Sequence, residues 1–145
     1  MAADDPKEDV QVLVVRQEQL DALIKGTDDE WVDFLVAHVK EQDPELADEY
    51  DDDALRGMVR VAIEKANRYG FNIAKDQSAF VSIMFEIAPN FDDQPEIKEL
   101  LEQMQVPPSY RLDNIWSSAV PDEIWEKARN DYNEDAWKSD REHSA

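Results

Sequence analysis

Apolar residues recur every three or four positions along most of this chain. The repeat covers residues 16–24, 31–39, 55–69, 80–87, 97–104 and 124–132. Such spacing places an apolar stripe on one side of a helix, and the stripe must be covered by a neighbouring element. Residues 10–15 alternate instead, but a single strand would have no partner, so we expect an extended segment packed on helices.

Residues that start or end helices fall between these stripes. Thr27 and Glu30 fit a capping box, and Asp51 to Asp53 can cap the next helix and favour its positive end. Gly70 suits the position just after that helix, and prolines separate the later ones.

The pattern therefore predicts an all-α, single-domain bundle of five to seven short helices with no sheet. We expect a mobile or extended N-terminus over residues 1–15, a helical domain over 16–132 and a polar tail over 133–145. Met104 and Tyr132 lie on the stripes and are expected to face inward. Trp116 and Trp137 lie outside them, and a tryptophan exposed beside acid is a natural anchor for a partner.

Charge restricts the classes of partner. The 145 residues carry 35 Asp and Glu against 15 Lys and Arg, a formal charge of −20. Such a chain is repelled by nucleic acid and by anionic membranes, so neither is expected as a partner. There is no cysteine for a disulfide or thiolate site, and no apolar segment resembles a secretory signal or a membrane span, so a cytoplasmic location is expected.

The acidic residues concentrate in one segment. Residues 27–53 hold twelve carboxylates and one cation, Lys40. One interpretation is a solvated loop with capping residues. The other is a docking face for a basic protein, which would speed association and weaken with salt. The residues assigned to this expected face are Asp28, Asp29, Asp33, Glu41, Asp43, Glu45, Asp48, Glu49, Asp51, Asp52 and Asp53.

Catalytic and metal motifs are not recognisable. A calcium loop starting at Asp51 would need an oxygen ligand at its fifth position and glycine at its sixth, where Leu55 and Arg56 stand. His38 lies on an apolar stripe without a second ligand nearby, which favours a core or boundary residue. We therefore expect no enzyme activity, no catalytic residue, no metal and no cofactor.

Several short motifs occur in a recognisable order: Arg68-Tyr-Gly-Phe71, Asp76, Met84-Phe85 and Pro89-Asn-Phe-Asp92, preceded by Arg16-Gln-Glu-Gln19 and Leu35-Val-Ala-His38. Over about residues 14–101, this order resembles small helical accessory proteins encoded in type VI secretion clusters beside PAAR-tipped or Rhs effectors. The resemblance implies a cytoplasmic accessory protein for effector loading, or one that neutralises the toxin, with no catalytic residues to transfer.

The motif positions also admit a structural role. A glycine helix end followed by an apolar residue, and a turn that buries a phenylalanine, are both packing features. Arg68 is a candidate for a structural ion pair. The residues in question are Arg68, Tyr69, Gly70, Phe71, Asp76, Met84, Phe85, Pro89, Phe91 and Asp92.

Together these observations favour a non-catalytic adaptor or co-chaperone. Its acidic helical face would mask a basic surface on a type VI effector or toxin, or on the chaperone that loads it. One alternative is an immunity protein that neutralises a cognate toxin. A less favoured alternative is an acidic mimic of DNA.

Overall fold

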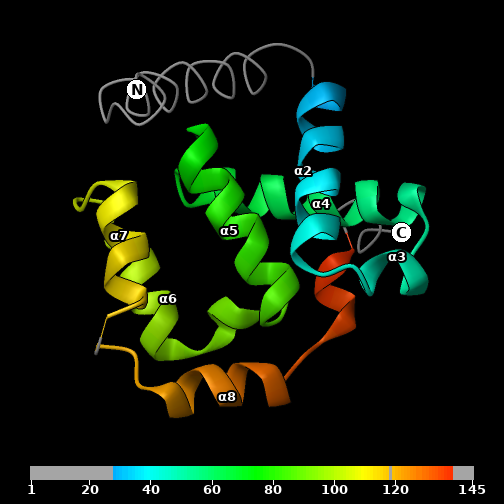
Figure 1. Cartoon of the computed structure of the whole chain (residues 1–145). Helices are drawn as coiled ribbons and strands as arrows, with labels where there is room; N and C mark the ends of the chain where they lie inside the picture. Colours follow the sequence, from blue (N-terminus) through cyan, green and yellow to red (C-terminus); the bar gives the residue numbers. More distant parts are fainter. Residues whose placement is uncertain (1–27, 118, 139–145) are drawn as a thin grey trace, which may run out of the picture.

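Helices joined by short turns make up the computed structural model, which describes residues 28–117 and 119–138 (Figure 1). The all-α prediction is confirmed for these residues, which contain no strand. The expected helix over 16–24, the Thr27 cap and the extended N-terminus lie outside the described residues. The elements are α2 (Asp28–Gln42), α3 (Leu46–Glu49), α4 (Asp52–Arg68), α5 (Ala74–Glu86), η2 (Phe91–Asp93), α6 (Pro95–Leu101), α7 (Pro108–Ile115), α8 (Asp122–Asn130) and η3 (Glu134–Trp137).

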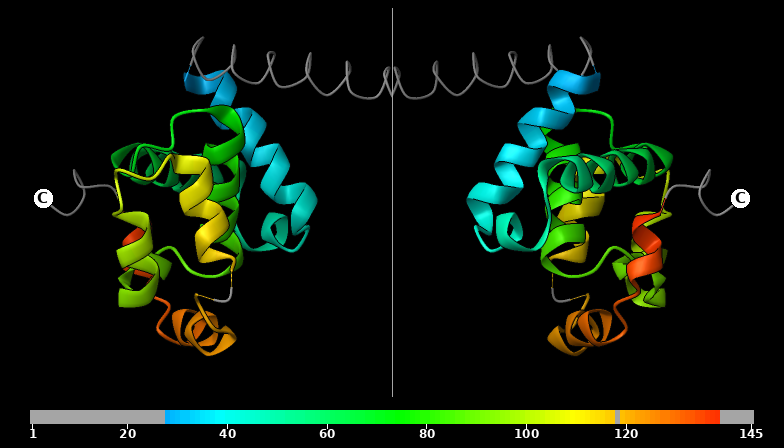
Figure 2. Two further views of the ribbon diagram at one scale, coloured as in Figure 1. Left: turned by 90° about the vertical axis from the view of Figure 1, so that its left-hand side faces the viewer. Right: turned by 90° about the vertical axis from the view of Figure 1, so that its right-hand side faces the viewer.

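Helix α4 packs against both α2 and α5, and these three helices enclose much of the apolar core (Figures 1 and 2). Helix α6 packs against α7 and η2, and α8 closes one end of the molecule against η2. Helix α4 buries most of its predicted stripe, including Leu55, Val59 and Ala62. None of the described helices combines the length and apolar character needed to cross a bilayer.

The two ends of α4 follow the sequence prediction. The Asp51 carboxylate accepts a hydrogen bond from the Ala54 amide at 2.8 Å, so Asp51 is the N-cap. Gly70 has a φ of 92°, in the left-handed region that favours glycine. A Cβ on Gly70 would also come within 3.3 Å of Arg111 Nη2.

Two predictions of inward-facing residues were wrong. Met104 is 59% exposed and Tyr132 is 46% exposed. The reason is that α6 ends at Leu101 and α8 ends at Asn130, so the helical period no longer applies at either residue. The prediction from the apolar pattern therefore made both helices too long.

The packed structure continues beyond Tyr132, the expected end of the helical domain. Trp137 in η3 is buried and lies 4.7 Å from Phe85, centroid to centroid. Its indole Nε1 donates a hydrogen bond to the Tyr132 hydroxyl at 2.8 Å. Trp137 therefore fixes part of the segment that the sequence assigned to a polar tail.

A buried arginine holds three separate chain segments together. Arg111 is 2% exposed, and its Nη1 donates hydrogen bonds to the Tyr69 and Leu101 carbonyls, each at 2.7 Å. Its Nε donates to the Val106 carbonyl at 3.0 Å, and the guanidinium lies 5.0 Å from the centre of the Phe71 ring. Burial lowers the pKa of Arg111, while the negative charge of Asp76 opposes that shift. The Arg111 guanidinium therefore connects the end of α4 to α6 and to the loop before α7.

Arg111→Met is expected to reduce the free energy of unfolding by about 3 kcal/mol, because it leaves buried carbonyl groups without a donor. Arg60→Met is the matched control, since Arg60 is exposed and pairs with the even more exposed Asp29. That change should cost less than about 1 kcal/mol. Urea unfolding followed by circular dichroism measures both, and equal losses would contradict the role assigned to Arg111.

Candidate partner-binding surface

The predicted acidic face lies on the surface. Of its eleven residues, the ten with described side chains, from Asp29 to Asp53, are all exposed. They come from α2, α3, the segments beside α3 and the first turn of α4. The side chain of the remaining residue, Asp28, is not among those described. These exposed acids therefore all belong to one continuous stretch of the chain, residues 29–53.

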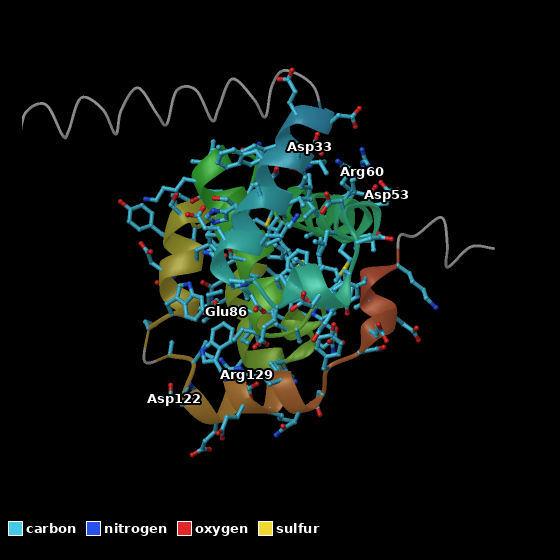
Figure 3. The ribbon with its side chains drawn as sticks, turned by 45° about the vertical axis from the view of Figure 1, so that its right-hand side comes forward. Asp33, Asp53, Arg60, Glu86, Asp122 and Arg129 are labelled. Carbon is cyan, nitrogen blue, oxygen red and sulfur yellow. The ribbon has the colours of Figure 1, made fainter. Side chains whose placement is uncertain are left out.

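Part of this surface is neutralised by cations from α2 and α4. Lys40 pairs with Asp52 at 2.8 Å, and Arg60 pairs with Asp29 at 2.6 Å. Arg56 contacts Asp33 at 2.7 Å and Asp53 at 3.0 Å. The labelled residues of this group, Asp33, Asp53 and Arg60, lie close together in Figure 3.

These ion pairs are exposed, so each stabilises the fold only weakly. The hydrogen bond and the positive charge of Lys40 hold the pKa of Asp52 below its usual value. The main consequence of the pairs is that three cations offset most of the charge of Asp29, Asp33, Asp52 and Asp53.

The unpaired acids gather at the other part of the face. We call this the acidic ridge and define it by Glu41, Asp43, Glu45, Asp48 and Glu49. The side chains of Glu41, Glu45, Asp48 and Glu49 form no hydrogen bond or ion pair with any described residue. The Asp43 carboxylate accepts a hydrogen bond from the Glu45 amide at 3.2 Å. Between residues 41 and 55 the sequence has no Lys or Arg.

The ridge rests on a small apolar contact. Leu46 is the one buried residue of the four in α3. Tyr50 follows α3 and lies near η3. Burial raises the pKa of Tyr50, and the nearby Tyr132, Glu134 and Glu49 raise it further. Glu134 thus extends the negative surface from α3 towards η3.

The motif residues form a connected interior network away from the ridge. The Tyr69 hydroxyl donates a hydrogen bond to Asp92 Oδ2 at 2.5 Å, and Lys65 pairs with the other Asp92 oxygen. Lys65 also donates to the Pro89 carbonyl at 2.9 Å. These contacts fasten the last turns of α4 to η2, a positioning role for Tyr69, Pro89 and Asp92.

The other motif residues mostly serve packing. Phe71, Met84 and Phe91 are fully buried, and Phe85 is partly buried against Trp137. Both carboxylate oxygens of the buried Asp76 accept from the Ser109 hydroxyl. Arg68 lies exposed in the last turn of α4. The geometry of the motif therefore agrees with the packing role suggested by its residue types.

Tyr69→Phe is expected to lower the free energy of unfolding by about 2 kcal/mol at neutral pH, because a hydrogen bond to a buried carboxylate is lost. Burial and the charge of Asp92 raise the pKa of Tyr69. Above about pH 10 the unfolded state loses this proton while the folded state keeps it, so Tyr69 makes stability fall as pH rises.

Tyr69→Phe should therefore give a shallower fall in stability with rising pH than wild type. Urea titrations from pH 8 to about pH 11 measure this slope. Tyr110→Phe, at an exposed side chain, is the matched control and should behave like wild type. An unchanged slope in Tyr69→Phe would contradict the assignment.

The described residues contain no group of three or more His, Cys, Asp and Glu side chains placed to hold a metal ion. His38 is half-buried and stacks on Phe34, with ring centres 6.4 Å apart. Phe34 in turn stacks on Trp31 at 5.5 Å. His38 therefore occupies the boundary position that its place on the stripe indicates.

No family model, no curated protein and no solved structure matches this chain.

Proposed function

We propose that this protein is a non-catalytic adaptor that binds a basic protein through the acidic ridge. The observation that carries the proposal is the separation of charge within the acidic face. Cations pair with the acids of its flank, whereas residues 41–55, which include the ridge, contain no Lys or Arg. A compact negative surface of this kind attracts a cationic partner and speeds encounter.

The form of the ridge suits masking of a basic surface. Its carboxylates project from α3 and the segments beside it, where almost every side chain is exposed. Lysine and arginine side chains of a partner would replace the solvent around these acids and relieve their mutual repulsion. Binding would then be reversible and sensitive to salt, as effector loading requires.

The resemblance over residues 14–101 suggests the identity of the partner. We take it to be a type VI secretion effector or the chaperone that loads it, with the adaptor acting in the cytoplasm. An immunity protein that neutralises a cognate toxin is the second candidate, because an acidic inhibitor suits a cationic cleft. A DNA mimic is the third, and it would compete with DNA for the same basic protein.

The triple variant Glu45→Gln, Asp48→Asn and Glu49→Gln tests the ridge while leaving Leu46 and the Asp51 cap intact. Binding is measured by surface plasmon resonance against the proteins encoded beside this gene. We expect association to slow about tenfold at low salt, with little change in the dissociation rate. Raising salt from about 50 mM to about 500 mM should reduce the difference from wild type.

A matched control carries Glu96→Gln, Glu99→Gln and Asp113→Asn, three exposed acids on α6 and α7. Both triple variants change the formal charge from −20 to −17. Equal slowing in the two would show that net charge, and not the ridge, governs association. Salt-independent binding would remove the electrostatic proposal.

Co-expression with the adjacent toxin separates the adaptor from the immunity protein. An adaptor should increase toxin accumulation or secretion without rescuing intoxicated cells. Rescue of those cells would instead support neutralisation. Release of the partner from DNA by this protein would favour the DNA mimic.

A further inference from the structure

A second candidate site lies between the end of α7 and α8. A hollow of about 710 Å³ opens between Trp116, just after α7, and one side of α8. Its apolar lining includes Ile87, Val120 and Pro121. The volume falls within the range of about 300–1,000 Å³ that is typical of small-molecule sites.

Two stacked tryptophans form one wall of this groove. The rings of Trp116 and Trp125 lie 4.7 Å apart and 15° from parallel. Trp125 is buried and stacks in turn on the buried Phe91 at 6.3 Å. Trp116 is 52% exposed, so its indole is held by the core and still offers surface to solvent. A fixed aromatic surface loses little entropy when a ligand packs on it.

Charged side chains complete the groove. Asp122 and Glu126 lie one turn apart on α8, and Arg129 follows one turn beyond Trp125. Figure 3 shows Asp122 and Arg129 at the end of the molecule that α8 forms. The lining thus carries two negative charges and one positive charge. The excess of negative charge favours binding of one cationic side chain, while Arg129 disfavours a ligand that carries several adjacent cations.

We propose that this groove binds a single arginine side chain, flanked by an apolar residue, from a partner polypeptide. A guanidinium is planar, so it stacks on an indole and pairs with a carboxylate through its edge. Asp122 and Glu126 supply the carboxylates, and the apolar lining takes the flanking residue. The site shares no residue with the acidic ridge, so it is independent of the function proposed above.

The test uses the full chain, labelled with ¹⁵N, and the peptide acetyl-Gly-Leu-Arg-Leu-Gly-amide as probe. Nuclear magnetic resonance follows the indole N–H signals of the tryptophans. We expect saturable shifts of the Trp116 and Trp125 signals. The same peptide with citrulline for arginine keeps the shape and loses the charge, and it should bind about tenfold more weakly.

Two isosteric variants on α8 provide the matched comparison. Glu126→Gln removes a charge from the groove and should weaken binding of the arginine peptide about threefold. Glu123→Gln removes a charge from the same helix outside the groove and should leave binding unchanged. The acidic ridge triple variant should also bind this peptide like wild type.

Several results would overturn the inference. They are equal binding of the arginine and citrulline peptides, equal effects of Glu126→Gln and Glu123→Gln, or no saturable shift at millimolar peptide. Dimerisation in analytical ultracentrifugation that Trp116→Ala abolishes would instead assign the groove to a second copy of this chain.

Discussion

The interior hydrogen bonds of Arg111 set the arrangement of this molecule. One guanidinium supplies donors to carbonyl groups at the end of α4, at the end of α6 and in the loop before α7. Gly70 turns the chain close beside it, where a Cβ would crowd the guanidinium. The direction in which α7 leaves this junction determines where Trp116 emerges next to α8. The buried contacts of Arg111 thus help to position the exposed Trp116 beside α8.

The charges of this protein have two different structural settings. Between α2 and α4, cations reach across to acids and give a surface of paired charges. At α3 the acids have no such partners among the described residues. The two regions of the acidic face therefore differ in how far their carboxylates are offset by cations.

The sequence predicted α4, whose apolar stripe is the longest, and α5, together with the Asp51 cap and the turn at Gly70. It failed at Met104 and Tyr132 because periodicity does not show where a short helix ends. Arg111 escaped notice because a cation beside Leu112 resembles a surface residue until the carbonyls around it are known.

For the candidate sites, the sequence could locate the acids but not their partners. Arg56 and Arg60 reach acids 23 and 31 positions away, which composition cannot show. Helix α3 has a further consequence. It is four residues long and is held by Leu46, so it can unwind locally at a lower free energy than α4 or α5. Amide hydrogen exchange there would then be fast within an otherwise protected domain, and the carboxylates could adapt their spacing to differently shaped cationic surfaces.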